Sequence, residues 1–330
     1  MEERIFILAG RLKSPKWELT KTPHMRFEGI YTPVITPMDA DRGIDESGYA
    51  TMIEHLIGQG THGLVIGGTT GENYALTPEE RVKQFHYAHE VIAGRVPWIA
   101  GVNDIRTEDV CQFAVEGRAA GASAILLAVP PYSVPNDKEL AQHALAVDKA
   151  CGLPIVIYNY PGRSGTEFGR EFLERVSRNA NFSAIKESSG DVDRIHMIAR
   201  EFPHLQMSCG ADDQALEFFV WGARSWVCAA GNFFGAECIT LYETCVVQGD
   251  FVKGRRIMKA LLPVMTVLER GGKFVQCVKY GCELDGLPAG TVRLPLRPMK
   301  KELKRELRDA ILTARTTVRR IVSEPQGQEA

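Results

Sequence analysis

Short apolar runs alternate with longer amphipathic segments along the chain from Gly29 onward. Eight of these runs have the length of a strand, and most are continuously apolar instead of alternating with polar residues. Continuous apolar strands are typical of a parallel sheet that is buried on both faces. The eight predicted strands are Ile30–Thr36, Gly63–Ile66, Trp98–Gly101, Ala124–Ala128, Ile155–Tyr158, Ser183–Ile185, Gln206–Cys209 and Ser225–Ala229.

The segments between the strands carry the signals of helix ends. Thr77–Glu80 offers a capping hydroxyl, then a proline and two acids for the first turn of a helix. Asp45 is expected to begin another helix in the same way. Glycines that can adopt the left-handed conformation at a helix end follow three of the predicted helices: Gly94, Gly121 and Gly152.

Eight strand-then-helix units in succession predict an α/β fold, a closed (β/α)8 TIM barrel. An open doubly wound sheet is the alternative, but the glycine-rich turn that usually follows its first strand is absent. Further helices are expected near residues 235–249, 251–270, 273–284 and 299–322. We therefore expect an N-terminal extension over 1–26, a barrel over 27–234, and a C-terminal helical region over 235–330 packed on the barrel.

The composition is that of an ordinary globular protein and narrows the function classes. Hydrophobic residues make up 45% of the 330 residues, charged residues 24%, and the net charge is −2, which indicates no nucleic-acid or membrane partner. The eight cysteines form no CxxC pair and no histidine has metal-ligand spacing, so we expect free thiols and no metal site. The sequence shows no signal peptide, and a cytoplasmic location is expected.

Catalytic groups of a TIM barrel lie at the carboxyl ends of its strands, and this rule selects candidates without any motif. The polar segments that follow the second, fourth, fifth and sixth predicted strands are Gly67–Glu72, Pro130–Tyr132, Tyr158–Gly165 and Lys186–Gly190. We expect these four segments to meet at one end of the barrel.

Lys186 is the candidate nucleophile because it closes the apolar segment Phe182–Ile185. A charged lysine is costly to bury inside a barrel, so the pKa of its amine should fall. A neutral amine is what Schiff-base formation requires. A structural ion pair, for example with Glu187, is the alternative that the position alone leaves open.

The other segments supply candidate binding and proton-transfer groups, each with a simpler explanation beside it. Thr69–Glu72 offers hydroxyls and backbone N–H groups that can hold a carboxylate. The simpler explanation is that the segment only forms a tight turn. Tyr158 can move protons between an imine and a neighbouring hydroxyl, or only pack. Arg163 can bind a carboxylate through two hydrogen bonds, or only be solvated.

Together these segments resemble the dihydrodipicolinate synthase / N-acetylneuraminate lyase family, over roughly Arg26–Leu312. The resemblance rests on Thr32-Pro33 to Thr36-Pro37, Gly68–Glu72, Pro130–Tyr132, Tyr158–Gly165, Ile185–Asp191 and Val292–Leu296. It implies a class I aldolase type of lyase, in which a lysine forms an imine with pyruvate or a related 2-oxo acid and no separate cofactor is needed.

The resemblance also assigns roles. The catalytic residues that it implies are Lys186, which attacks the ketone, Tyr158, which shuttles protons, Thr69, which relays them, and Tyr132, which completes the relay of a neighbouring subunit. The binding residues that it implies are Thr70 and Gly71 for the pyruvate carboxylate, Arg163 for the acceptor and the backbone carbonyl of Val227, which faces pyruvate. A role for Tyr132 across subunits implies a homodimer or homotetramer.

The second substrate is less clearly indicated. An arginine at position 163 resembles the synthase branch, where it meets the carboxylate of aspartate semialdehyde, and so favours a carboxylate-bearing aldehyde. Three segments depart from the synthase pattern: Pro131 to Ser133, Asn73-Tyr74 and Gly272–Gln276. The first two touch the lysine feedback site of regulated synthases, and the third lies near the substrate end of the barrel. The alternatives are another 2-oxo acid aldolase, or a deaminase or dehydratase acting on a sugar-acid or hydroxyproline-pathway intermediate.

Overall fold

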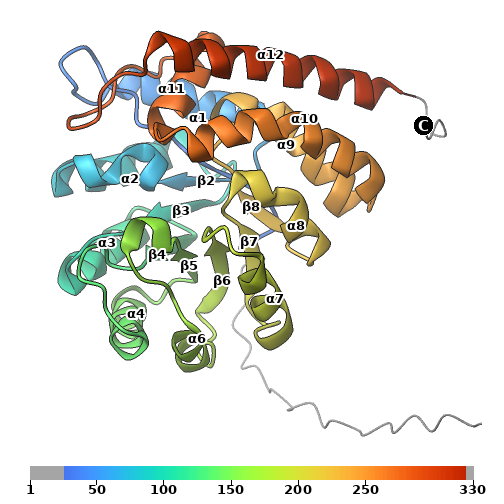
Figure 1. The fold of residues 1–330 in the computed structure, drawn as a ribbon. Helices are drawn as coiled ribbons and strands as arrows, with labels where there is room; N and C mark the ends of the chain where they lie inside the picture. Colours follow the sequence, from blue (N-terminus) through green and yellow to red (C-terminus); the bar gives the residue numbers. More distant parts are fainter. Residues whose placement is uncertain (1–25, 325–330) are drawn as a thin grey trace, which may run out of the picture.

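The computed structural model describes residues 26–324, which form a closed barrel of eight parallel strands (Figure 1). Each strand pairs with the next in the chain, and the last pairs with the first. The strands are β1 (Gly29–Pro33), β2 (Gly63–Ile66), β3 (Trp98–Gly101), β4 (Ala124–Ala128), β5 (Ile155–Asn159), β6 (Phe182–Glu187), β7 (Gln206–Cys209) and β8 (Ser225–Val227). The predicted TIM barrel is confirmed, and the extension predicted over 1–26 lies almost wholly outside the described residues.

The strand bounds differ from the prediction mainly where side chains take over the backbone hydrogen bonds. β1 was expected to reach Thr36 but ends at Pro33. Beyond it, the Asn232 side chain accepts from the Ile35 N–H at 3.2 Å and donates to the Pro33 carbonyl at 2.9 Å. β6 is longer than predicted and includes Lys186. Lys186 is therefore held by the sheet itself and not by a loop.

A helical segment follows every strand. The helices are α1 (Glu46–Gly58), α2 (Pro78–Ile92), α3 (Thr107–Ala119), α4 (Asp137–Cys151), the short α5 (Pro161–Ser164), α6 (Arg170–Val176), α7 (Val192–Glu201), α8 (Ala215–Val220) and α9 (Gly231–Tyr242). Thr77 caps α2 as expected, and the Glu80 carboxylate in turn accepts from the Thr77 N–H, which completes a capping box. The three glycines predicted to end helices, Gly94, Gly121 and Gly152, all have positive φ.

Three further helices complete the chain: α10 (Phe251–Arg270), α11 (Phe274–Leu284) and α12 (Lys301–Ser323). Figure 1 shows them together on one side of the barrel, with α12 running along the edge of the molecule. α9 begins ahead of the predicted boundary at 235 and bends at Phe234, whose backbone angles are not helical. It occupies the place of the helix that follows β8.

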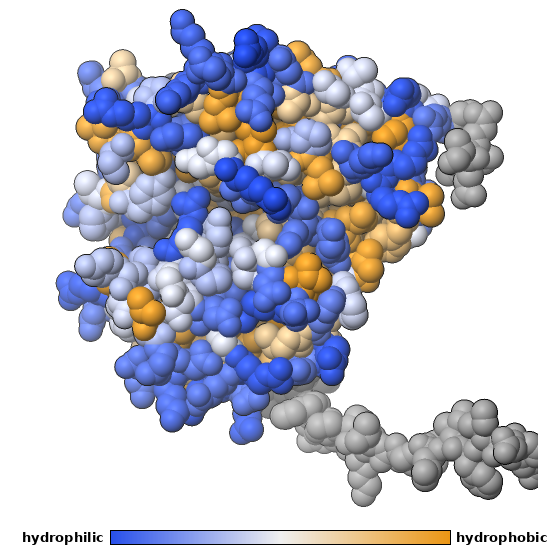
Figure 2. Space-filling model, in the orientation of Figure 1, coloured by the Kyte–Doolittle hydropathy of each residue, from blue (hydrophilic) through white to orange (hydrophobic). Residues whose placement is uncertain are grey.

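Two apolar clusters fill the molecule. The larger lies between the strands and the surrounding helices, and the smaller fills the barrel interior with side chains that include Val156, Tyr158 and Ala184. Because side chains alternate across a strand, Ala184 inside the barrel places Lys186 inside as well. Polar side chains cover most of the face in Figure 2, with hydrophobic residues scattered between them. No helix within residues 26–324 is both long and apolar enough to cross a membrane.

Candidate active site

Lys186 lies inside the barrel near the carboxyl end of β6, where its side chain is 8% exposed. The strand register places it beside Tyr158 on β5, and its Nζ lies 3.9 Å from the centroid of the Tyr158 ring. Burial lowers the pKa of Lys186 to about 8, although the carboxylates of Asp212 and Glu269 act in the opposite direction. A substantial share of the amine is therefore neutral near physiological pH.

Lys186 and Glu187 do not form the ion pair that the sequence left open. Glu187 is the next residue on the strand and points away from the barrel interior, as the alternation of side chains requires. Its carboxylate accepts from Arg194 Nε at 2.9 Å and from Asn159 Nδ2 at 3.0 Å. Glu187 therefore fixes the outer side of the strand and leaves the Lys186 amine without that partner.

Tyr158 stands across from Lys186 with its phenol in the same interior, and it is 6% exposed. Burial raises the pKa of Tyr158 above its ordinary range. The charge of Arg163 and a side-chain hydrogen bond with Thr69 both lower it, although by less. The phenol is thus protonated at neutral pH, next to a hydroxyl with which it can exchange a proton.

The turn after β2 brings Thr69, Thr70 and Gly71 to the same end of the barrel as one turn of 3-10 helix. The Gly71 N–H donates to the Gly68 carbonyl at 3.0 Å, so it is already engaged within the turn. A Cβ on Gly71 would approach the Val34 carbonyl to 3.0 Å, so the backbone around it leaves little space for a side chain. Of the two residues expected to hold a carboxylate, the geometry favours Thr70.

Six of the eight predicted site residues line one small cavity above the Lys186 amine. They are Lys186, Tyr158, Thr69, Thr70, Arg163 and Val227. Arg163 comes from the short helix after β5, and its guanidinium carbon lies 5.4 Å from the Tyr160 ring centroid and 5.7 Å from that of Phe274. The barrel therefore brings predicted residues from four strand ends, those of β2, β5, β6 and β8, to one cavity, whereas the segment after β4 does not line it.

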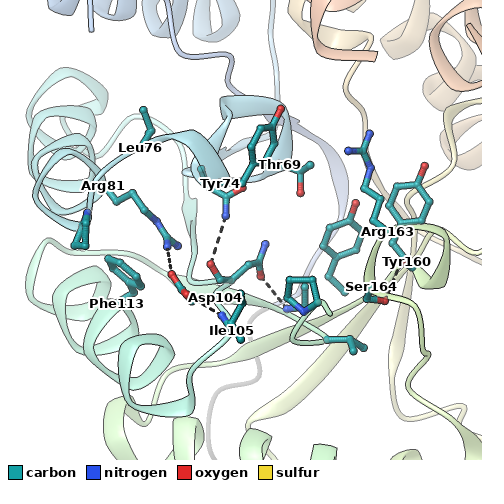
Figure 3. A pocket seen from close by; sticks show the side chains of 17 residues that line it. Thr69, Tyr74, Leu76, Arg81, Asp104, Ile105, Phe113, Tyr160, Arg163 and Ser164 are labelled. Atoms are coloured by element: carbon teal, nitrogen blue, oxygen red, sulfur yellow. Dashed lines mark hydrogen bonds and ion pairs between the residues drawn. The ribbon is translucent and has the colours of Figure 1, made fainter. Parts of the chain in front are cut away.

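A second cavity, of about 490 Å³, adjoins the first and shares four of its residues: Thr69, Tyr158, Tyr160 and Arg163. Figure 3 shows Arg163 and Tyr160 at one end of it and the ion pair of Arg81 with Asp104 at the other. Tyr74 and Pro131, which depart from the synthase pattern, both line this second cavity. It therefore has room for a ligand next to the amine and a different wall from the one that the resemblance implies.

The chain matches known proteins over most of its length. A profile of the Dihydrodipicolinate synthetase family covers residues 26–314. The chain belongs to this family. It is 32% identical, over 87% of its length and 99% of the relative, to the 4-hydroxy-tetrahydrodipicolinate synthase of Bacillus velezensis. Like these relatives, it is a lyase of the class I aldolase type.

Two solved structures from the family give the same fold. A dihydrodipicolinate synthase from Bacillus anthracis is 30% identical, with a TM-score of 0.83 over 88% of this chain and 99% of that one. A chloride-inhibited dihydrodipicolinate synthase from Acinetobacter baumannii, solved in complex with pyruvate, is 28% identical, with a TM-score of 0.82 over the same shares. The barrel and its C-terminal helices are therefore those of the Dihydrodipicolinate synthetase family.

Tyr132 lies apart from the other predicted residues. Its side chain is 92% exposed, its φ is +71°, and it lines neither cavity of its own chain. Nearby Val134 also has positive φ and is 56% exposed. A single chain of this family member therefore leaves Tyr132 outside its own site, and its expected role across subunits stays a prediction.

Asp212 and Glu269 also line the cavity and were not selected from the sequence, whereas Phe274 lies in the Gly272–Gln276 segment that departs from the synthase pattern. Asp212 follows β7, so the strand-end rule that found Lys186 could have found it. Its buried carboxylate accepts from Trp226 Nε1 at 2.8 Å and from the Ala230 N–H at 3.0 Å. Glu269 and Phe274 come from the helices after the barrel, which that rule does not cover.

Proposed function

We propose that this enzyme forms an imine between Lys186 and pyruvate, or a related 2-oxo acid, and joins the resulting enamine to an aldehyde that carries a carboxylate. Aspartate semialdehyde is the first candidate for that aldehyde. The observation that carries the proposal is the buried Lys186 amine with its lowered pKa, which opens on a cavity beside Tyr158. The covalent imine is the only carrier in this proposal, and no separate cofactor takes part.

In the first half of the reaction, Thr70 holds the carboxylate of the 2-oxo acid and the Val227 carbonyl faces it. The neutral amine adds to the ketone carbon and gives a carbinolamine. Tyr158 supplies the proton with which the hydroxyl leaves as water, and Thr69 passes protons to and from the phenol. The iminium that remains is an electron sink for the carbon next to it.

In the second half, loss of a proton from the methyl carbon of that iminium gives an enamine. The enamine carbon attacks the aldehyde carbon and forms the new carbon–carbon bond, while the aldehyde oxygen takes up a proton. Water then adds to the iminium and releases Lys186. Arg163 binds the carboxylate of the aldehyde in this proposal, since its guanidinium lies at the mouth of the same cavity.

The proposal also includes a homodimer or homotetramer in the cytoplasm, in which Tyr132 reaches the relay of a neighbouring subunit. Its exposure in the single chain supports a contact of this kind. Mixing a Tyr132→Phe protein with a Lys186→Ala protein tests it. Partial recovery of activity in the mixture supports the exchange of Tyr132 between subunits, and no recovery contradicts it.

Borohydride reduction tests the central step. With pyruvate present, reduction should add the mass of the trapped adduct to one peptide, the one that contains Lys186. Lys279, which is also buried, serves as the internal control and should stay unmodified. Labelling of another lysine, or of none, would contradict the proposed chemistry. Turnover with pyruvate and a panel of aldehydes, and with hydroxylated 2-oxo acids alone, then separates a synthase from a deaminase or dehydratase.

A further inference from the structure

Glu269 brings a carboxylate to the reaction cavity from outside the barrel. It lies in the last turn of α10, is half-buried, and lines the cavity together with Lys186 and Arg163. The backbone N–H of Asp212 donates a hydrogen bond to it. That bond connects the end of α10 to the segment after β7, so the carboxylate has a defined place above the amine.

Glu269 lacks the cation that a carboxylate in such a place normally has. Within residues 26–324, no lysine, arginine or histidine nitrogen lies within 4.0 Å of its oxygens. The adjacent Arg270 turns to Asp213 instead, at 3.4 Å. Burial, together with the charges of Asp212 and Asp213, raises the pKa of Glu269 to about 8, while Lys186 lowers it. A cation brought in by a ligand would therefore stabilise the ionised form of Glu269.

Arg163 is the complementary case on the same cavity wall. In the described part of the chain, no carboxylate lies within 4.0 Å of its guanidinium, and the side chain is exposed toward the cavity mouth. Arg163 and Glu269 both influence the phenols of Tyr158 and Tyr160, with opposite signs. A guanidinium and a carboxyl group thus share one small space without an ion pair between them.

We propose that Arg163 and Glu269 together bind the amino-acid end of the second substrate, with the carboxylate at Arg163 and the ammonium group at Glu269. This inference rests on the proposed function and adds Glu269 to it, as the group that recognises the ammonium group of an amino aldehyde. An α-amino acid carries its ammonium group and its carboxylate on the same carbon, so one ligand can supply a cation to Glu269 and an anion to Arg163. Glu269 is then a specificity-determining residue, while pyruvate binds deeper, at Lys186.

Three aldehydes that differ at one position test this assignment with pyruvate as the partner. L-Aspartate 4-semialdehyde carries the ammonium group, 2-hydroxy-4-oxobutanoate carries a hydroxyl in its place, and succinate semialdehyde carries neither. They are compared by kcat/KM in the wild type, Glu269→Gln, which loses the charge, and Glu269→Met, which loses the charge and the hydrogen bonds. Glu302→Gln, an exposed glutamate in the first turn of α12, is the matched control.

The wild type and the control should prefer the amino aldehyde to succinate semialdehyde by about tenfold to a hundredfold, the usual effect of a hydrogen bond to a charged group. Glu269→Gln and Glu269→Met should lose most of that preference through a higher KM for the aldehyde, with an unchanged KM for pyruvate. A hydroxy aldehyde preferred to the amino aldehyde would overturn the assignment of an ammonium group.

Borohydride trapping of pyruvate on each variant separates this inference from the proposed function. If pyruvate is trapped at Lys186 in the wild type and Glu269→Met, but the preference among aldehydes is unchanged or no aldehyde reacts, the role of Glu269 is refuted and the imine chemistry stands. If the wild type traps no pyruvate, the proposed function itself fails. Thermal melting of the variants shows whether the loss of a side chain has disturbed the fold.

Discussion

Two buried lysines in this molecule have opposite surroundings. Lys186 is 8% exposed and Lys279 is 2% exposed. Lys279 Nζ lies 2.6 Å from Glu72 Oε1 and also donates to the Thr291 carbonyl. The Lys186 Nζ instead lies over the face of the Tyr158 ring, 3.9 Å from its centroid. One amine is neutralised by a fixed carboxylate, and the other opens on a cavity.

The comparison shows that burial alone does not make a lysine a nucleophile. Burial lowers the pKa of both amines, but for Lys279 the charge and hydrogen bond of Glu72 act against it. The Lys279–Glu72 pair has a structural task, because Glu72 directly follows the Thr69–Gly71 turn and Lys279 belongs to α11. The Lys186 amine thus faces a cavity, and Lys279 ties the Thr69–Gly71 turn to the C-terminal helices.

Exchange of each lysine for methionine should give the largest difference. Lys186→Met should abolish pyruvate trapping and lower kcat by more than about 10³-fold, because Lys186 is the one lysine of the described residues that lines the cavity. Its stability should be unchanged or higher, since an apolar side chain replaces a buried amine that forms no ion pair within residues 26–324. Borohydride trapping checks the loss of imine formation, and urea unfolding checks the stability of the variant. Retained trapping in this variant would place the imine elsewhere.

Tyr158→Phe should have the next largest effect on catalysis. It keeps the ring that packs against Lys186 and removes the hydroxyl, so kcat should fall by about 10²–10⁴-fold. Steady-state turnover measures this, and trapping at long times should still label Lys186, only more slowly. Tyr160→Phe, on the same cavity wall, is the control, and its kcat should fall far less. Equal losses in the two variants would argue against a particular proton-transfer role for Tyr158.

The sequence predicted the fold and the centre of the site because both depend on local patterns. The continuous apolar runs gave all eight strands, four of them with the same bounds as in the structure: β2, β3, β4 and β7. Lys186 could be found because the side-chain alternation of one strand fixes its direction. The absence of an ion pair between Lys186 and Glu187 within residues 26–324 could not be predicted. It depends on Arg194 from α7 and Asn159 from β5, which bind the Glu187 carboxylate.

The outer part of the site was not predictable in the same way. Glu269 ends a helix whose buried residues include Ile257, Leu261 and Leu268, and a polar residue in that pattern is usually solvated. Only the packing of α10 across the strand ends brings its carboxylate to the cavity. The pairing of Glu72 with Lys279 likewise joins segments far apart in the chain. Charges that meet through tertiary packing leave no periodic signal.

Lys279→Met should mainly affect stability. It leaves the fully buried Glu72 carboxylate without its cation, which costs about 3–5 kcal/mol in the free energy of unfolding. The double variant Glu72→Met with Lys279→Met should recover most of this loss, because no uncompensated charge remains. Urea unfolding measures the three proteins. An equal loss in the single and the double variant would show that the pair contributes by packing and not by charge.

The smallest predicted effect is a difference between the two lysines in how their reactivity depends on pH. It reports most directly on the surroundings of each amine. With a pKa lowered to about 8, Lys186 is about one-tenth neutral at pH 7, and its reactivity should rise about tenfold per pH unit below 8 and then level off. Competitive acetylation with trace acetic anhydride, followed by peptide mapping, measures this residue by residue. Exposed lysines in the same digest provide the reference for the extent of acetylation.

Glu269→Gln sharpens this measurement and fixes its sign. The carboxylates of Asp212 and Glu269 and the nearby Cys209 raise the pKa of Lys186, whereas burial and Arg163 lower it. Near pH 8, where the Glu269 carboxyl group also ionises, the loss of its charge should therefore move the midpoint of Lys186 to lower pH. Lys279 should stay unreactive in both proteins, since Glu72 occupies its amine. A midpoint for Lys186 near that of the exposed lysines would mean that burial has not lowered its pKa, and the contrast between the two lysines would then lie only in access to the cavity.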